Sequence, residues 1–426
     1  MYRVHQYLQE LRVKRLMQEA ASIQGDIEHI TALLPNNMSR YDHRLWLWYE
    51  MDSSTKSRHE LVMWEYFNST RLFLTYEHMP VIGLPTSLKA GINIALEVLL
   101  DIMNTKDGAV HPFIPPYHLF DGFTVTDQSS GVHYTLHMSV HREGVQDPVD
   151  YIANVFLPFQ GVGMGIYQES RILLNTIINV IVGVSRTGDM TDFLRMYEEV
   201  CLRPGLKTHL HVVLFGRNEN MLSKVSLLQR SYPRKNITIH QVSTENFSHA
   251  TSYDHVANKL RDTDLMLFFD YNFVFTAEFL DHCRINAVRG RQAYFPVLFS
   301  FYKPELVHRH IQRPLQMLIS ADTGFFLRYN YQVVAIYKSD YKHVGGFGRN
   351  QGSLNDDVRF VDKVLSRGLY VMRALEPYLR RYYKPRTCKG LTGNTHLACM
   401  NSRADAIGSK KILGSLIVSH DLLDKI

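Results

Sequence analysis

The second half of the chain alternates short, continuous apolar runs with segments whose apolar residues recur at helical spacing. The runs predict buried strands, and the stripes between them predict helices. The strands are expected at residues 177–184, 208–215, 237–242 and 265–269, and the helices at 192–200 and 253–260. Strands that alternate with helices imply an α/β fold with a mostly parallel sheet, whose ligands bind beyond the carboxyl ends of the strands.

The first segment of the chain, residues 1–34, has one apolar stripe. Its members recur at spacings of three and four and are Leu16, Ala20, Ile23, Ile27, Ile30 and Leu34. This pattern predicts an amphipathic helix that ends at Pro35. The apolar face fits either a coiled-coil partner or the surface of its own or a neighbouring domain, and we favour the second interpretation.

Residues 35–170 mix helical and β patterns. A helix is expected after Pro85, because Leu88, Ile92, Ala95, Leu96, Leu99 and Met103 share one face and Gly108 lies just beyond it. Alternating apolar and polar residues predict a β-hairpin region at 123–141. The glycine-rich stretch 160–165 marks the expected boundary before the α/β domain.

The composition of the chain is that of an ordinary globular protein. Of its 426 residues, 45% are hydrophobic and 21% are charged, and the formal net charge is +6. A mildly basic protein suits a polyanionic partner. No helix-turn-helix, zinc-finger or RNA-binding motif accompanies the charge, so nucleic acid is not expected as that partner.

Cysteines and glycosylation motifs bear on the compartment. The four cysteines form no CxxC pair, so no zinc site is expected from them. Cys388 and Cys399 form either a disulfide, which needs an oxidising compartment, or two separate buried thiols. Sequons at Asn37, Asn68, Asn236 and Asn246 favour the secretory pathway. The most apolar stretch, 172–184, is shorter than the roughly 20 residues of a spanning helix, so no anchor is expected within this chain.

An acidic residue ends the most apolar predicted strand. Asp270 follows residues 265–269, and Asp270-Tyr271-Asn272 is a variant of an Asp-x-Asp pattern. Alternate residues of such an extended strand end can direct oxygen ligands at a divalent cation such as Mn²⁺ or Mg²⁺ and at a diphosphate. Taken alone, this stretch favours the simpler interpretation that Asp270 only ends a strand.

Further motifs connect this strand end to a known family. They include 276–284, 294–300, Val184-Ser185-Arg186, Asp322-Thr323-Gly324-Phe325, Gly352 to Asp357, Glu376-Pro377 and 388–402. Together they resemble the chondroitin N-acetylgalactosaminyltransferase family, which includes the chondroitin synthases and the chondroitin polymerizing factor. The chain most resembles the carboxyl-terminal half of the polymerizing factor. Members usually carry a membrane anchor and a second, amino-terminal glycosyltransferase domain, and this chain shows neither.

The resemblance implies a GT-A-type glycosyltransferase domain at 171–426, with a nucleotide-sugar half at 171–310 and an acceptor half at 311–426. It implies transfer of N-acetylgalactosamine (GalNAc) from UDP-GalNAc to the terminal glucuronate of chondroitin, with Mn²⁺ as cofactor, in the Golgi lumen. Asp357, or alternatively Asp356, would be the general base. Arg186, Asp270 and Asn272 would contact the nucleotide sugar, and Asp270 would be a metal ligand.

The chain departs from the family pattern at several of these positions. The second aspartate of Asp-x-Asp is Asn272, and a tryptophan that helps to hold the acceptor sugar is Ser353. Where active members place a metal-binding histidine after Glu376-Pro377, this chain has cationic residues: Arg380, Arg381 and Lys384. A cation repels Mn²⁺ instead of coordinating it. The sequence therefore predicts weak or lost metal binding.

These departures leave several interpretations of function open. The chain could be a catalytically weakened partner of an active chondroitin synthase, or a non-catalytic scaffold of the same complex. Alternatively, Arg380, Arg381 or Lys384 could replace the metal and neutralise the departing UDP. The same cations could instead bind the acidic glycosaminoglycan chain or form an ordinary solvated basic surface.

Overall fold

The computed structural model describes residues 57–107, 112–145, 147–233, 236–244, 246–307, 318–347, 356–385 and 387–419. These residues all belong to one compact unit, Trp48–Ile426. The amphipathic helix expected at 1–34, the sequon at Asn37 and the substitution at Ser353 lie outside the described residues.

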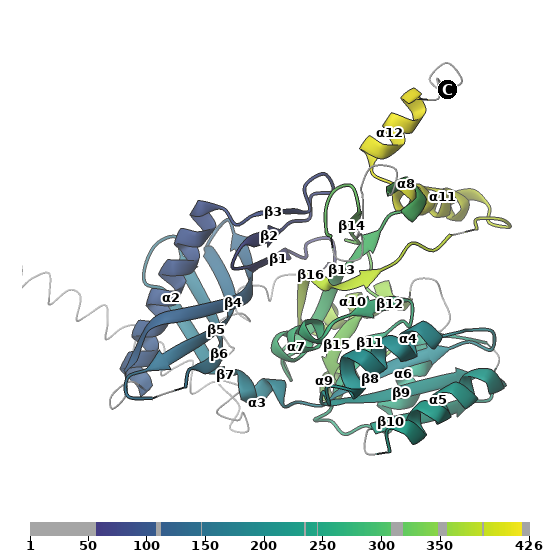
Figure 1. Cartoon of the computed structure of the whole chain (residues 1–426), viewed down its shortest axis with the longest axis horizontal. Coiled ribbons are helices and arrows are strands. Elements are labelled where there is room, and N and C mark those ends of the chain that lie inside the picture. Colours follow the sequence, from purple (N-terminus) through teal and green to yellow (C-terminus); the bar gives the residue numbers. More distant parts are fainter. Residues whose placement is uncertain are drawn as a thin grey trace, which may run out of the picture. The chain divides into compact units, whose positions relative to one another are not determined.

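A mostly parallel sheet forms the centre of this unit (Figure 1). Its strands follow the order β10-β9-β8-β11-β15-β13-β16-β1, and β15 alone among these runs antiparallel to its neighbours. In that order the bounds are Asn236–Val242, Thr208–Phe215, Ile178–Val184, Leu265–Phe269, Val334–Tyr337, Gln292–Phe301, Tyr370–Arg381 and Met63–Asn68. The predicted α/β fold with a Rossmann-like sheet is confirmed.

Helices and short strands complete this part of the fold. The helices are α3 (Ser170–Leu174), α4 (Thr191–Tyr197), the π-helix η2 (Glu198–Leu202), α5 (Glu219–Ser231), α6 (His249–Ala257), α7 (Ala277–Asn286), α8 (Pro304–Val307), α9 (Lys338–His343), α10 (Asp356–Ser366), α11 (Gly393–Ile407) and α12 (Lys410–Ser419). Strand β12 (Phe273–Phe275) pairs with the end of β16, and β14 (Gly324–Phe326) pairs with β13.

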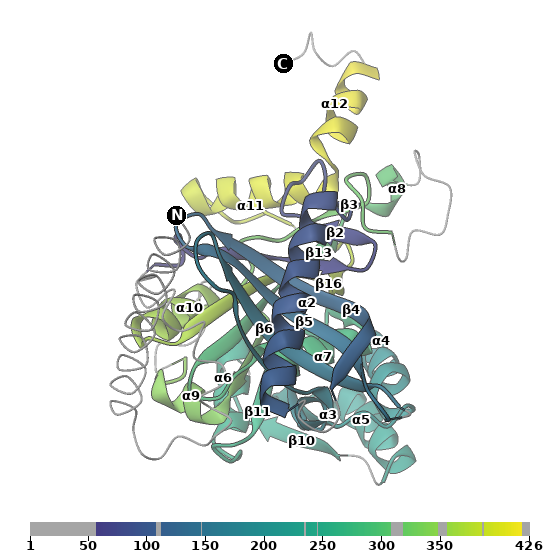
Figure 2. The same ribbon diagram turned by 90° about the vertical axis from the view of Figure 1, so that its left-hand side faces the viewer.

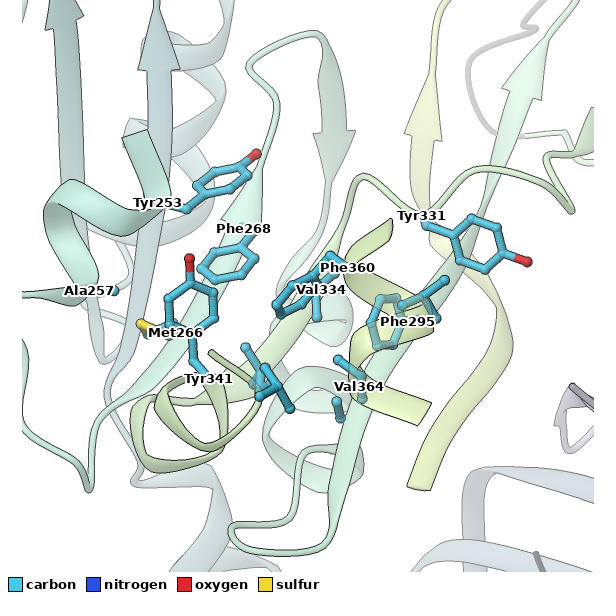
Figure 3. Packing of buried hydrophobic residues seen from close by; sticks show 14 of the residues in the cluster. Tyr253, Ala257, Met266, Phe268, Phe295, Tyr331, Val334, Tyr341, Phe360 and Val364 are labelled. Carbon is cyan, nitrogen blue, oxygen red and sulfur yellow. The ribbon is translucent and has the colours of Figure 1, made fainter. Parts of the chain in front are cut away.

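A row of aromatic side chains fixes α6, β11 and α10 relative to one another (Figure 3). Tyr253 of α6 stacks on Phe268 of β11, with ring centroids 4.4 Å apart. Phe268 in turn meets Phe360 of α10 edge-on at 6.0 Å. Full burial of rings of this size contributes several kcal/mol, because each removes about 150–250 Å² from water. The core thus ties α6 and α10, which both border the candidate site, to the central strand.

A second, antiparallel sheet adjoins β1. It contains β2 (Arg71–Phe73), β3 (Val81–Gly83), β4 (Phe113–Asp127), β5 (Gly131–Arg142), β6 (Val149–Pro158) and β7 (Met164–Glu169). Helix α2 (Thr86–Asp107) packs its apolar face on this sheet (Figure 2). The predicted helix after Pro85 and the predicted hairpin are both confirmed, although the hairpin strands are longer than expected.

Strand β1 belongs to both sheets. It pairs in parallel with β16 on one side and antiparallel with β4 on the other. Beside this junction, the buried imidazole of His282 on α7 lies between two carboxylates: its Nδ1 is 2.7 Å from Glu376 Oε2, and its Nε2 is 3.4 Å from Asp121 Oδ2. Burial alone would lower the pKa of His282, but the two carboxylates outweigh it and raise the pKa to about 10. A protonated histidine therefore joins α7, β16 and β4.

Two of the four cysteines form a disulfide and two are free thiols. Cys388 and Cys399 form a disulfide, so the disulfide alternative is the one that the structure contains. Cys201 and Cys283 are buried free thiols. Within the described part of the chain, no helix is long and apolar enough to cross a membrane.

Candidate active site

The carboxyl ends of the parallel strands bring together acids that are far apart in sequence. Asp270 follows β11 directly, and Asp356 and Asp357 begin α10. All three line one cavity of about 220 Å³. The other lining residues are Phe247, Ser248, His249, Ala250, Tyr253, Tyr331, Gln332 and Phe347. The predicted arrangement, an acid pair across a cavity from the strand end, is therefore present.

The Asp270-Tyr271-Asn272 turn is held by its own hydrogen bonds. The backbone N–H of Asn272 donates to Asp270 Oδ1 at 2.9 Å, and Asn272 Nδ2 donates to the same oxygen at 2.7 Å. The other side of the amide, Asn272 Oδ1, accepts a hydrogen bond from Lys384 Nζ. Asn272 thus connects the carboxylate of Asp270 to the ammonium of Lys384.

Strand pairing explains why Lys384 reaches this turn. Strand β12, which follows Asn272, runs antiparallel to the end of β16, with Phe273 opposite Arg381. The chain that leaves β16 therefore passes beside Asn272, and Lys384 extends to it. Arg381 occupies the register position next to the turn, whereas Lys384 makes the hydrogen bond to it.

The side chains present do not fit a family-type Mn²⁺ site. A neutral amide stands where the second carboxylate of Asp-x-Asp would be, and its oxygen already accepts from an ammonium group. Mn²⁺ favours several hard oxygen or imidazole ligands. Among the described residues, no three His, Cys, Asp or Glu side chains converge into a group that could hold a metal ion.

Asp357 has the surroundings of a general base. Burial raises the pKa of its carboxyl, although the backbone N–H groups of Val358, Asp357 and Tyr331 partly offset that effect. A carboxylate with a raised pKa accepts a proton more readily than an ordinary aspartate. Asp357 also lies in the first turn of α10, where the helix dipole favours its charged form.

A buried arginine supports the loop opposite Asp357. Arg373 of β16 is 1% exposed and donates from Nη2 to the carbonyl oxygens of Arg328 and Asn330, at 2.8 and 2.6 Å. Its guanidinium also lies 4.2 Å over the ring of Tyr331. Burial lowers the pKa of Arg373 to about 10. Arg373 thereby positions Tyr331, which lines the cavity.

His249 and Phe247, which were not predicted from the sequence, also line the cavity. His249 Nε2 is 3.8 Å from Asp270 Oδ2, and its Nδ1 is shielded from solvent without a hydrogen-bond partner. Burial lowers the pKa of His249 despite the nearby Asp270 and Asp357, which favours a neutral imidazole. The ring of Phe247 also lines the cavity and offers an apolar surface on which a planar base can stack. The Ser248 N-cap of α6, which accepts from the N–H of Thr251, is the local signal that could have located both residues.

Asn272, Arg381 and Lys384 lie at the Asp270 turn without lining the cavity, and two further predicted site residues lie away from the turn. Arg186 is exposed in the loop after β8, at the same edge of the sheet, but does not line the cavity of Asp270. Arg380 lines a different cavity, beside the end of β1. Its Nε donates to the carbonyl oxygen of Pro377 at 2.8 Å.

A mostly parallel sheet with an acid at the end of a central strand is the arrangement expected of a GT-A-type domain. The chain belongs to the chondroitin N-acetylgalactosaminyltransferase family, because the family model of that description matches residues 1–413. The family named from the sequence motifs is therefore confirmed.

Individual relatives agree with this assignment. Mouse chondroitin sulfate N-acetylgalactosaminyltransferase 1 is 32% identical over 77% of this chain and 63% of the relative. Mouse chondroitin sulfate synthase 3 is 23% identical over 99% of this chain and 53% of the relative. The chain thus spans about half to two-thirds of the length of these relatives.

Solved structures are less similar. GalNAc-T7 with UDP, GalNAc and Mn²⁺ is 9% identical, with a TM-score of 0.39 over 55% of this chain and 49% of that chain. The fold assignment rests on the strand order and the family, and not on this likeness.

Proposed function

We propose that this chain is a catalytically weakened subunit of chondroitin synthesis that assists an active chondroitin synthase. Its reaction class is transfer of GalNAc from UDP-GalNAc to glucuronate-ended chondroitin, in the Golgi lumen. One observation carries the proposal: the ammonium of Lys384 is hydrogen-bonded to Asn272, at the turn where the family pattern places a metal ligand.

The physical reason is electrostatic. A divalent cation at Asp270 would lie next to the fixed charge of Lys384, and this repulsion acts where the loss of one carboxylate has already reduced the attraction. Asp270 is 13% exposed, so solvent screens these charges less than it would at an open surface. We therefore expect weak Mn²⁺ binding at this turn.

Other parts of a transfer site are retained. Asp357, with its raised pKa, is suited to accept the proton of an acceptor hydroxyl, and Asp356 is the second choice. Asp270, with Arg186 at the same sheet edge, is suited to contact the nucleotide sugar. The disulfide between Cys388 and Cys399 supports an oxidising compartment such as the Golgi lumen.

The hydrogen bond between Lys384 and Asn272 also favours a second candidate function. Lys384 is an exposed cation at the strand end, and a fixed cation can stabilise the charge of a departing diphosphate without metal. In this alternative the chain retains transfer activity that does not depend on Mn²⁺. The remaining alternative is a scaffold subunit with no transfer activity.

A transfer assay separates the candidates. GalNAc incorporation from UDP-GalNAc into glucuronate-ended chondroitin is measured with the chain alone, with an active chondroitin synthase alone, and with both, each in Mn²⁺ and in EDTA. A weakened partner gives little activity alone and increases incorporation in the mixture. Activity of the chain alone in EDTA would favour metal replacement by Lys384. Strong Mn²⁺-dependent activity of the chain alone would contradict the proposal.

Calorimetry with Mn²⁺ tests the cause directly. The double variant Asn272→Asp, Lys384→His restores a carboxylate and an imidazole and removes the ammonium. We expect its Mn²⁺ affinity to exceed that of the unaltered chain by about 100-fold or more, since a ligand is gained and a repulsion is lost. Lys342→His, at an exposed lysine paired with Asp262, is the matched control and should leave Mn²⁺ binding unchanged. Micromolar Mn²⁺ binding by the unaltered chain would contradict the electrostatic argument.

A further inference from the structure

A second cavity, of about 270 Å³, opens at the ends of β1 and β16. It is separate from the cavity of Asp270, because the two share no lining residue. Its lining is Asn68, Thr70, Arg71, Phe73, Ile319, Pro377, Tyr378 and Arg380. The volume is near the lower end of the range for small-ligand pockets, roughly 300 Å³.

The charged side chains among the described lining residues of this cavity are all positive. Arg71 and Arg380 contribute two guanidinium groups, and no Asp or Glu is among the described residues that line the cavity. Asn68, Thr70 and Tyr378 add polar groups beside them. Guanidinium groups bind carboxylates through paired hydrogen bonds, so this lining suits an anion with sugar-like hydroxyl groups around it.

A rigid turn presents Arg71. Asn68 Oδ1 accepts from the N–H of Thr70 at 3.0 Å, from the hydroxyl of Thr70 at 3.1 Å and from the N–H of Arg71 at 2.8 Å. The turn also leads directly into β2, which pairs with β1. Arg71 therefore projects from a fixed backbone, and its side chain is exposed.

Arg380 of β16 lines the same cavity as Arg71 of β2. Its Nε donates to the carbonyl oxygen of Pro377, which orients the guanidinium. Burial lowers the pKa of Arg380, yet an arginine stays charged at neutral pH. An anion in this cavity would be attracted to both guanidinium groups.

The position of the cavity indicates which anion. Strands β1, β16 and β11 run in the same direction in one sheet, so the ends of β1 and β16 lie at the same edge as Asp270. A long polymer whose end enters the Asp270 cavity can follow this edge. Resting on the proposed function, we propose that this cavity holds the carboxylate of an internal uronic acid of the acceptor polysaccharide, away from the end that is extended.

Binding of a long unsulfated chondroitin oligosaccharide tests this site. Affinity is measured by calorimetry at low salt for the unaltered chain, for Arg71→Ala, and for the control Arg171→Ala, whose side chain is 80% exposed on α3 before the amino end of β8. We expect Arg71→Ala to bind about tenfold more weakly, the loss typical of one charge-assisted contact, and Arg171→Ala to bind as the unaltered chain does. The chain is produced without N-glycans, because Asn68 belongs to a sequon and lines the cavity.

Two further binding measurements identify which chemical group occupies the cavity. Chondroitin with its carboxyl groups reduced should bind about as weakly to the unaltered chain as native chondroitin binds to Arg71→Ala. UDP-GalNAc binding should be the same for the unaltered chain and Arg71→Ala, since Arg71 does not line the Asp270 cavity. Equal binding of native and reduced chondroitin, or an unchanged affinity in Arg71→Ala, would overturn the site.

Failure of the site and failure of the proposed function give different results. If the chain binds UDP-GalNAc and chondroitin but Arg71→Ala changes neither, the second cavity is not the polysaccharide site and the proposed function stands. If the chain binds no UDP-GalNAc, the nucleotide-sugar function fails, while the chondroitin measurements still decide the cavity. If it binds no chondroitin, the cavity proposal fails.

Discussion

Asn272 shows how one atom changes the chemistry of a site. An aspartate there would present two acceptor oxygens, whereas the amide presents one acceptor and one donor group. The donor group satisfies Asp270, and the acceptor takes the ammonium of Lys384. An aspartate at position 272 would instead add a second negative charge to the turn. The substitution and the cation are therefore consistent with each other, and either one alone would leave a charge unbalanced.

Asp357 provides a prediction at the residue scale. Asp357→Asn should reduce any GalNAc transfer by the chain about 100-fold to 10,000-fold, because the amide cannot accept the proton. Transfer by the unaltered chain should rise with pH through a pKa above the ordinary aspartate value, since burial raises the pKa of Asp357 and the base must be ionised. Initial rates across pH measure both effects.

The control for this prediction lies on the same helix. Asp362 of α10 is 44% exposed and pairs with Arg58 at 2.5 Å. Asp362→Asn should keep the rate and its pH profile. A rate for Asp357→Asn that equals the rate for Asp362→Asn would remove Asp357 from the reaction.

Only some residues of the candidate site could be predicted from the sequence. Asp270 could be placed from the apolar strand that it ends, whereas Asp356 and Asp357 were placed with it only because their motif resembles that of the family. Phe247 and His249 could not be assigned to the site, since the Ser248 cap beside them marks only where α6 begins and not which side chains line the cavity. Their place depends on tertiary packing, as in the stack of Tyr253 on Phe268.

At the scale of elements, the strongly apolar strands were the most predictable. The predicted bounds of β11, 265–269, equal the observed Leu265–Phe269, because a fully buried strand is continuously apolar and Asp264 and Asp270 flank it. Helix α6 begins four residues earlier than predicted, at His249, because Ser248 caps it. Strand β1 was not predicted, since its pairing with β16 depends on residues more than three hundred positions away.

The loop before β15 gives a prediction at this scale. Arg373→Lys should loosen residues 328–331, because an ammonium cannot reproduce the fork that holds the carbonyl oxygens of Arg328 and Asn330 and covers the ring of Tyr331. We expect the free energy of unfolding to fall by about 2 kcal/mol. UDP-GalNAc affinity should also fall, which a purely structural role would not require.

The control for this prediction is Arg367→Lys, at an exposed position just before β16. It should change neither the free energy of unfolding nor nucleotide-sugar binding. Loss of stability in Arg373→Lys with unchanged UDP-GalNAc affinity would show that Arg373 supports the core but not the site.

At the scale of the whole described unit, the two sheets are joined through buried polar groups as well as through β1. His282 contacts Glu376 of the mostly parallel sheet and Asp121 of the antiparallel sheet. Tyr66 of β1 donates to Asp121 at 3.3 Å and lies 3.2 Å from the hydroxyl of Tyr378. Sequence reasoning could not find this network, because its members come from separate elements and no spacing pattern connects them.

This network predicts a pH dependence of stability. The pKa of His282 is about 10 in the folded chain and 6.5 ordinarily. Because the pKa of His282 is raised in the folded chain, its protonated imidazole contributes fully to the free energy of unfolding below pH 6.5. This contribution is lost as the pH rises through about 10. His282→Gln should therefore lower the free energy of unfolding by about 3–5 kcal/mol near pH 6.5, since it leaves two carboxylates without their cation. The gap to the unaltered chain should narrow toward pH 10.

Urea unfolding at both pH values measures this gap. His396→Gln, at an exposed histidine of α11, is the control and should show a small difference that does not depend on pH. A gap for His282→Gln that stays constant between the two pH values would mean that His282 is neutral in the folded chain.

The place of β1 beside β16 also constrains how the protein is made. Trp64 and Tyr370, which share a 2.9 Å hydrogen bond across this pair, are 306 residues apart. During synthesis, β1 leaves the ribosome long before its neighbour β16 does. Until then one edge of β1 has no strand beside it, and an uncovered strand edge promotes aggregation. Chains that terminate before residue 370 should therefore depend on chaperones far more than chains that continue through β16 do.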